Sequence, residues 1–118
     1  MRESKKTGEK GEEVASDYLK RKGFDILERN YKNKHSEIDI IAKKEGVLVF
    51  VEVRSTSSLL FGTPEETIDF RKTRKLEKNA LAYTFFNDYE GEYRVDVVTV
   101  VFEENKIKEI NHYENVTV

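Results

Sequence analysis

Apolar residues in the first part of the chain recur at the spacing of an amphipathic helix. The stripe, at i, i+1, i+4 and i+5, consists of Val14, Ala15, Tyr18 and Leu19. It predicts a helix over residues 8–22, with Thr7 as the N-cap candidate and Gly23 as the stop. Glu12 shares a side with this stripe and lies at its edge, so we expect its carboxylate to border the buried face.

Five later segments have the patterns of strands. The predicted strands cover residues 24–29, 37–42, 47–55, 92–102 and 106–113, and the last of them is an edge strand. A short turn over residues 43–46 ends in Gly46, which suits a positive φ, so the second and third strands should form an antiparallel hairpin. A second helix should run to about residue 86, starting at Thr63-Pro64 or alternatively at Asp69.

The element order is therefore α-β-β-β-α-β-β. This order predicts an α/β (α+β) fold with a mixed five-stranded sheet flanked by helices. The length of 118 residues suits a single domain over residues 1–118. No apolar run approaches the roughly 18 residues that cross a bilayer. Residues 1–13 have no apolar segment behind their charges, so we expect no signal peptide, a cytoplasmic protein and no membrane partner.

Composition narrows the chemistry of the chain. There is no cysteine, which excludes disulfides and thiolate sites. The formal net charge is −2, which argues against a protein that coats nucleic acid non-specifically, because phosphate binding depends on Lys and Arg. An acidic metal site lowers the net charge even when a basic face lies elsewhere on the molecule. The local pattern of charges is therefore a better guide to nucleic-acid binding than the net charge.

The predicted hairpin carries a cluster of acidic residues. Strand alternation places Glu37 and Asp39 on one side of their strand, and Ile38 and Ile40 on the other. It places Glu52 with Arg54 on one face of the next strand. Glu52 interrupts the apolar run over residues 47–53, where a carboxylate is unfavourable unless it is paired or bound to a cation. Carboxylates on adjacent strands can bind one Mg²⁺, which takes oxygen ligands and neutralises charge that builds up on a phosphate.

A structural interpretation of the same residues is equally open. Glu52 with Arg54, or Asp39 with Lys43, would then be charge pairs on an exposed sheet face.

Basic residues on the predicted second helix form a stripe. Arg71, Lys75 and Lys78 share a helix face at i, i+4 and i+7, and Lys72 is offset by one position. Such a stripe can follow a phosphate backbone, although a solvated helix face explains it as well. The candidate residues for nucleic-acid binding are Lys32, Lys34, Arg71, Lys72, Lys75 and Lys78.

The histidines and one further aspartate favour structural roles. His35 and His112 are far apart in sequence, and no cysteine completes a zinc set with them. Asp96 shares a strand face with Arg94, so we expect these two residues to form an ion pair.

Four segments of the chain stand in a specific order. They are Gly11-Glu12 with Tyr18-Leu19, then Asn30-Tyr31 with Glu37-Ile38-Asp39-Ile40-Ile41, then Phe50-Val51-Glu52-Val53-Arg54, and Phe61-Gly62-Thr63-Pro64-Glu65 leading to Lys72. Together, from about Gly8 to Phe102, they resemble the YraN-like family of small uncharacterised bacterial proteins. The set Asp39 and Glu52-Val53-Arg54 also resembles the PD-(D/E)xK nuclease signature.

This resemblance implies a restriction-endonuclease-like fold, similar to that of archaeal Holliday-junction resolvases. It implies a Mg²⁺- or Mn²⁺-dependent endonuclease that acts on DNA, including branched or junction DNA, as a homodimer. Asp39 and Glu52 would be the metal ligands, and Glu12 would reach the site from the first helix.

Arg54 stands where the nuclease signature has Lys. An arginine cannot act as a base, because its pKa exceeds about 12. Arg54 can still stabilise a transition state, and the general base would then be a hydroxide bound to the metal ion or Lys72. The alternatives are a non-catalytic nucleic-acid-binding or adaptor domain that retains the nuclease fold and, third, a purely structural partner-binding protein.

Overall fold

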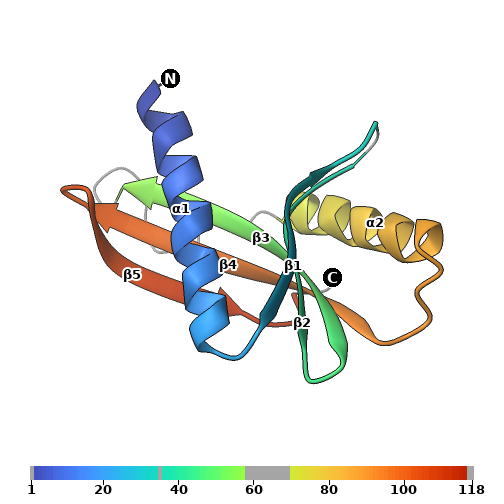
Figure 1. Ribbon diagram of the computed structural model, residues 1–118. Helices are drawn as coiled ribbons and strands as arrows, with labels where there is room; N and C mark the ends of the chain where they lie inside the picture. Colours follow the sequence, from blue (N-terminus) through green and yellow to red (C-terminus); the bar gives the residue numbers. More distant parts are fainter. Residues whose placement is uncertain (1, 35, 58–69, 117–118) are drawn as a thin grey trace.

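Two helices and a five-stranded sheet form the described chain in the computed structural model, which covers residues 2–34, 36–57 and 70–116. In order, the elements are α1 (Arg2–Arg21), β1 (Asp25–Lys32), β2 (Glu37–Lys44), β3 (Val47–Ser57), α2 (Phe70–Phe86), β4 (Tyr93–Glu103) and β5 (Lys106–Tyr113). The order α-β-β-β-α-β-β and the mixed sheet confirm the predicted fold class (Figure 1).

The strands lie in the sheet in sequence order, from β1 at one edge to β5 at the other. All neighbours are antiparallel except β3 and β4, which are parallel. A parallel pair needs a crossover connection, and α2 lies in the connection between these two strands. The predicted β2–β3 hairpin and the edge position of β5 are both confirmed. Neither described helix is long and apolar enough to cross a lipid bilayer.

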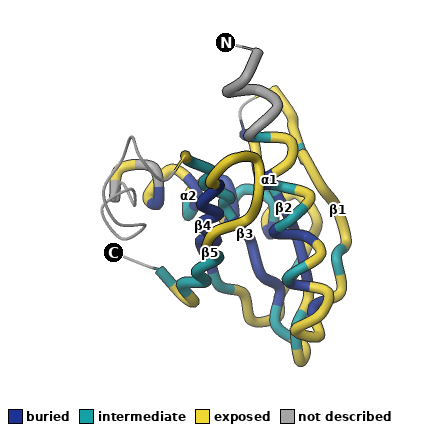
Figure 2. Tube along the Cα trace, turned by 90° about the vertical axis from the view of Figure 1, so that its left-hand side faces the viewer, coloured by how far each residue is buried: buried dark blue, intermediate teal, exposed yellow. Residues whose placement is uncertain are grey.

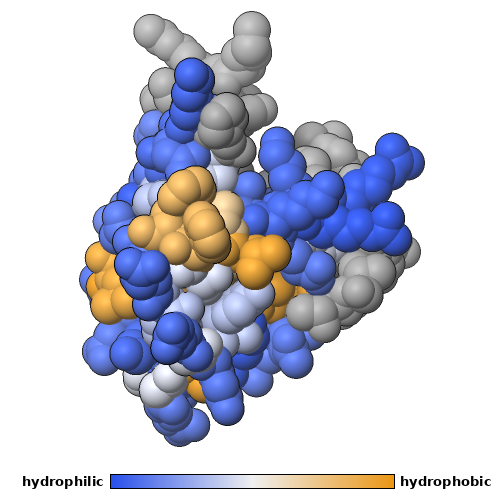
Figure 3. Space-filling model, turned by 90° about the vertical axis from the view of Figure 1, so that its right-hand side faces the viewer, coloured by the Kyte–Doolittle hydropathy of each residue, from blue (hydrophilic) through white to orange (hydrophobic). Residues whose placement is uncertain are grey.

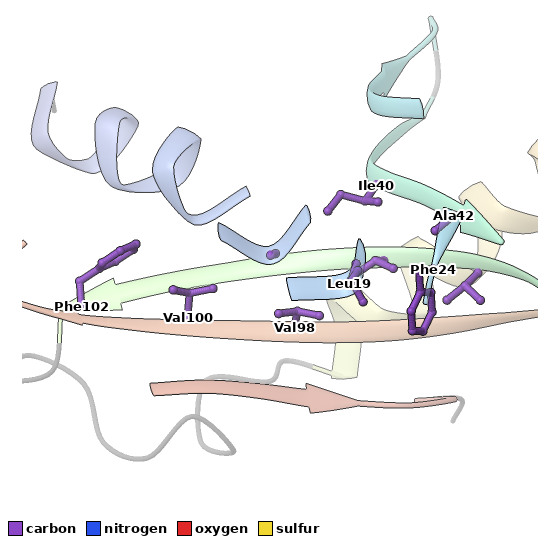
Figure 4. Close-up of a cluster of buried hydrophobic side chains, with 10 residues drawn as sticks. Leu19, Phe24, Ile40, Ala42, Val98, Val100 and Phe102 are labelled. Carbon is purple, nitrogen blue, oxygen red and sulfur yellow. The ribbon is translucent and has the colours of Figure 1, made fainter. Parts of the chain in front are cut away.

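Each helix covers its own apolar cluster. The α1-side cluster is shown in Figure 4 and includes Ala15, Leu19, Phe24, Ile40, Ala42, Val49, Val51, Val98, Val100 and Phe102. The α2-side cluster consists of Ile38, Ile41, Leu48, Phe50, Leu76, Ala80 and Val95. Because alternate residues of β3 belong to different clusters, the two helices pack on opposite faces of the sheet. Burial is greatest along the central strands, whereas β1 is mostly exposed (Figure 2).

Several boundaries differ from the prediction. α1 begins at Arg2, so Thr7 is inside the helix and is not its N-cap; no strong helix breaker precedes Gly8 to stop it. β1 extends through Lys32, into residues predicted as a connection, because they pair with the start of β2. The tight turn is confirmed at Glu45 and Gly46, with φ values of 49° and 82°. Both candidate starts of α2, Thr63-Pro64 and Asp69, lie outside the described residues.

Candidate functional site

The sheet forks part-way along the β2–β3 hairpin. Pairing between the two strands ends at Ile40 and Val51, although β2 begins at Glu37 and β3 continues to Ser57. Beyond this point β2 stays paired with β1 and β3 with β4, so the β1–β2 arm rises away from the rest of the sheet (Figure 1). Ile38 was predicted to face the same way as Ile40. That prediction is wrong, because Ile38 packs into the α2-side cluster beyond the fork.

Asp39 occupies the point where the strands separate. Its Oδ2 accepts a hydrogen bond of 2.9 Å from the backbone N–H of Val53, a residue that has no partner on β2. Burial is the main cause that raises the pKa of Asp39 to about 6, against the opposing hydrogen bond from Val53. Neighbouring carboxylates add to the rise in pKa, and they belong to Glu12, Glu52 and Glu37. Negative charge is therefore crowded at the fork.

A cavity of about 290 Å³ opens between the fork and α2. Its walls are Glu37, Asp39 and Glu52 from the strands and Lys75, Leu76 and Asn79 from the helix, and we call it the acidic cavity. Asn79 is buried, and its Nδ2 donates a hydrogen bond of 3.0 Å to the backbone oxygen of Glu37, which ties α2 to the start of β2. The acidic residues predicted on the hairpin thus face one shared space.

Glu12 approaches the fork from α1. It is half-buried, as its place at the edge of the apolar stripe predicted. Burial raises the pKa of Glu12; the charge of Arg29 and a hydrogen bond with Asn30 oppose the rise, and the Glu37 carboxylate adds to it. The electrostatic effect of Glu12 on Asp39 brings the third predicted ligand into the same group of charges.

Close packing of α1 on β3 sets the position of Glu12. Gly11 is buried, and a Cβ at this residue would overlap Ser55 Oγ and lie 2.8 Å from Ser55 Cβ. A helix can approach a strand this closely only where the contact residue has no side chain. Gly11 therefore sets the distance between α1 and β3, and the next residue along α1 is Glu12.

Arg54 forms an ion pair with Glu52, one of the residues that line the acidic cavity. Its Nε lies 3.5 Å from Glu52 Oε2, so a charge pair of the kind expected from the structural interpretation is present, although it lies within one strand. Arg54 Nη2 is buried and has no hydrogen-bond partner among the described residues. A buried guanidinium donor without a partner suits an anionic ligand, because charge-assisted hydrogen bonds to phosphate are strong.

The donor chemistry of the acidic cavity suits a hard divalent cation. Mg²⁺ takes oxygen ligands, keeps several waters and commonly binds only one or two protein carboxylates; Mn²⁺ accepts the same donors. In residues 2–34, 36–57 and 70–116, no set of three or more His, Cys, Asp or Glu side chains is arranged to hold an ion. Two carboxylates on one cavity, those of Asp39 and Glu52, fit an ion that retains part of its water shell.

The candidate phosphate-binding residues divide between cavities and open surface. Lys75 lines the acidic cavity itself. An adjoining cavity of about 600 Å³ is lined by Lys34, Lys75 and Lys78 together with polar and apolar residues. Lys32 and Arg71 are exposed and line neither cavity.

Two candidates fall outside the described part of the chain. They are the side chain of Lys72, predicted as the alternative base, and His35, predicted as a loop residue.

A fully buried aspartate, Asp96, lies on the α1 side of the sheet. Asp96 accepts hydrogen bonds from Arg94 Nε at 3.1 Å, from His112 Nε2 at 2.8 Å and from the Asn115 backbone N–H at 2.9 Å. Burial alone would raise the pKa of Asp96, but these donors outweigh it and hold the pKa below its usual range. The predicted Arg94–Asp96 ion pair is confirmed.

Sequence reasoning missed two of these contacts. Asn79 interrupts the apolar stripe of α2 between Leu76 and Ala80, and a buried polar residue in that position signals a hydrogen bond that must be satisfied. His112 meets Asp96 only because β4 and β5 pair in one particular register, and no local pattern in the sequence encodes that register.

The fold and the site together define a small α+β domain whose hairpin opens into an acidic cavity. The model of the uncharacterised protein family UPF0102 matches residues 11–100, and the chain belongs to this family. A UPF0102 protein of Persephonella marina is 45% identical over 95 residues, covering 80% of this chain and 82% of its own. One of Carboxydothermus hydrogenoformans is 43% identical over 110 residues, covering 92% of both chains. UPF0102 protein FP2501 of Flavobacterium psychrophilum is 39% identical over 115 residues, covering 98% and 96%. The match confirms the resemblance to the YraN-like family, while these names state no activity.

Proposed function

We propose that this protein is a Mg²⁺- or Mn²⁺-dependent endonuclease that acts on DNA. The observation that carries the proposal is the gathering of the Asp39, Glu52 and Glu37 carboxylates on one cavity, where burial first and the neighbouring carboxylates second raise the pKa of the half-buried Asp39 to about 6. A partly buried group with its pKa shifted by burial and by specific neighbours, at the wall of a cavity, is a candidate for function rather than for stability. A divalent cation is the ligand that would neutralise this charge.

The residues at the fork have distinct roles in this proposal. Asp39 and Glu52 would hold the ion, with Glu12 in support, and the bound ion would supply positive charge next to the scissile phosphate. Arg54, whose Nη2 lacks a partner among the described residues, would donate to a phosphate oxygen as negative charge develops on it. Lys75, on the opposite wall, would bind a neighbouring phosphate.

A non-catalytic nucleic-acid-binding domain is the second candidate. It is favoured by the contact of Arg54 with Glu52, because an arginine that pairs with a ligand carboxylate partly replaces the cation. This candidate predicts DNA binding that falls steeply with salt, and no turnover.

Cleavage of labelled duplex, single-stranded and four-way-junction DNA with Mg²⁺, Mn²⁺ or a chelator tests the proposal. Cleavage should require the ion, and Asp39→Asn should lower the rate by about 1,000-fold, which corresponds to about 4 kcal/mol of transition-state stabilisation. Asp17→Asn is the matched control, because Asp17 is an exposed aspartate on α1, and its rate should not change.

Three results would decide between the two candidates. Activity that survives Asp39→Asn would point to a contaminating nuclease. Absence of both cleavage and Mn²⁺ binding, with DNA binding intact, would overturn the nuclease and support the binding domain. Arg54→Lys restores the residue of the nuclease signature, so a gain in rate would assign the arginine a direct part in the chemistry.

We also propose a homodimer, from the resemblance to junction resolvases, since a junction presents two cut sites to a two-fold symmetric enzyme. Sedimentation equilibrium should give twice the mass of the chain, and a monomer at high concentration would exclude this assembly.

A further inference from the structure

A second cavity continues from the acidic one along α2. It has a volume of about 600 Å³ and lies between the tip of the β1–β2 arm and the helix. We call it the basic–aromatic groove; its lining residues are Asn33, Lys34, Ser36, Lys75, Lys78, Asn79, Ala82 and Phe86. Figure 3 views the molecule from the side on which α2 ends in Figure 1, and it shows an apolar patch bordered by strongly hydrophilic side chains.

Three lysines give the groove its charge. Lys75 and Lys78 lie one turn apart on α2, and Lys34 faces them from the tip of the β1–β2 arm. All three are exposed, and none forms an ion pair with a carboxylate in the part of the chain that the structure describes. Three lysines around one groove, with no ion pair among these residues, suit a polyanion, and nucleic-acid affinity depends mainly on such contacts with phosphate.

An exposed aromatic ring closes the end of the groove. Phe86, the last residue of α2, is 71% exposed. Ala82 lies one turn before it and leaves space above the helix, because its side chain is small. Exposed aromatic rings next to lysines are the platforms on which proteins stack the bases of single strands.

The groove is built from fixed parts of the fold. Ser36 donates backbone and side-chain hydrogen bonds of 2.8 Å to Asn33 Oδ1, which closes the turn that carries Lys34. The Asn79 contact with Glu37 holds this arm against α2. The backbones that carry Lys34 and the side chains of α2 are therefore set relative to each other before any ligand arrives.

We propose that the basic–aromatic groove binds an unpaired, single-stranded segment of nucleic acid, with a base stacked on Phe86 and phosphates at Lys34, Lys75 and Lys78. Lys75 and Asn79 line both cavities, so a strand held in the groove leads directly to the acidic cavity. A base within a duplex is already stacked and cannot use the ring, so the groove selects substrates that have a single-stranded part. Cleavage of the bound strand at the acidic cavity rests on the proposed function, whereas binding of the strand in the groove can be measured without cleavage.

Fluorescence anisotropy in the presence of a chelator isolates that binding step. The probes are a labelled oligothymidine strand and a blunt duplex of equal length. The wild type should bind the single strand more tightly than the duplex, and Phe86→Ala should weaken single-strand binding by about 5- to 150-fold. Phe86→Tyr should restore it. Leu81→Ala is the matched control, because Leu81 is an apolar residue of α2 that is 60% exposed and does not line the groove, and the affinity of this variant should stay within about twofold.

The outcomes separate this inference from the proposed nuclease activity. Absence of single-strand binding, equal or tighter binding of the duplex, or an unchanged affinity of Phe86→Ala would overturn the inference. Single-strand binding that depends on Phe86, with no cleavage under any ion, would retain the inference and overturn the nuclease. Cleavage of blunt duplex that is insensitive to Phe86→Ala would retain the nuclease and overturn the inference. Thermal unfolding of each variant checks the fold, which an exposed ring should hardly affect.

Discussion

Two aspartates of the same sheet, Asp96 and the half-buried Asp39, have opposite surroundings. Asp96 is fully buried, yet three donors surround its carboxylate and its pKa lies below the usual range. Asp39 accepts one backbone hydrogen bond, lies among other carboxylates and has its pKa raised to about 6. The first arrangement stabilises the charged form of an aspartate, and the second destabilises it.

The difference agrees with a structural role for Asp96 and with the ligand-binding role that we propose for Asp39. A structural carboxylate is matched by donors from its own chain, as Asp96 is by Arg94 and His112. The carboxylate of Asp39 lies among other carboxylates, and in the function that we propose a cation supplies the missing positive charge. Stability measurements on the two residues should therefore give opposite signs.

The largest expected effect on stability is at Asp96. Asp96→Asn removes the negative charge that Arg94 and His112 surround, and breaking a buried charge pair from one side leaves the partner uncompensated. We expect a loss of about 2 to 4 kcal/mol in the free energy of unfolding near neutral pH, measured by urea denaturation.

The exposed Asp17→Asn is the control, and its stability should change by less than about 0.5 kcal/mol. The loss at Asp96 should shrink in acid. The lowered pKa means that this carboxylate contributes stability above its unfolded pKa, and that the contribution disappears as the pH falls through the folded pKa. An equal loss at acidic and neutral pH would show that packing, not charge, makes Asp96 important.

The next largest effect on stability is at Asp39 and has the opposite sign. The folded pKa of Asp39 lies above its unfolded value, so the folded state binds the proton more tightly and stability falls as the pH rises from about 4 through about 6. Asp39→Asn removes this penalty. We expect it to stabilise the metal-free protein by about 1 to 3 kcal/mol near pH 8 and to have little effect near pH 4.

Divalent ions give this second prediction a direct check. The ion and the proton compete for Asp39, so Mn²⁺ should raise the unfolding temperature of the wild type more at about pH 8 than at about pH 5, and should not do so in Asp39→Asn. If Asp39→Asn destabilises the protein at neutral pH in the presence of a chelator, the two aspartates are both structural and the comparison fails.

The fold was largely predictable from the sequence because its signals are local. The apolar alternation of β3, the helical stripe of α1 and the turn at Gly46 each follow from spacing that a few neighbouring residues decide. The predicted start of α1 was wrong because the charged residues before Gly8 favour a helix but add no apolar pattern that would reveal it.

The site was predictable only in part. Glu37, Asp39 and Glu52 line one cavity, as the hairpin prediction required, although strict alternation fails at Ile38, which packs on the α2 side. The fork itself was not predictable, because the loss of pairing after Ile40 and Val51 depends on how the β1–β2 arm leaves the sheet. Of the donors around Asp96, the sequence predicted Arg94, because it lies on the same strand. It did not predict His112, which comes from a neighbouring strand.

The smallest predicted effect concerns the contact between α1 and β3 that positions Glu12. Gly11 allows α1 to pack closely on Ser55, and this packing places Glu12 at the fork. Gly11→Ala should therefore push the helix outward and lower the free energy of unfolding by about 1 to 2 kcal/mol, measured by urea denaturation, despite the better helix propensity of alanine.

The matched control is Gly8→Ala in the same helix. A Cβ at Gly8 meets nothing within 4 Å, so this change should stabilise the protein by about 0.5 to 1 kcal/mol. Mn²⁺ affinity adds a second readout, because Gly11→Ala should move Glu12 away from Asp39 whereas Gly8→Ala should not, so only the first change should weaken binding of the ion. If Gly11→Ala destabilises the protein but leaves Mn²⁺ affinity unchanged, Glu12 belongs with the structural carboxylates, and the ion is held by the strands alone.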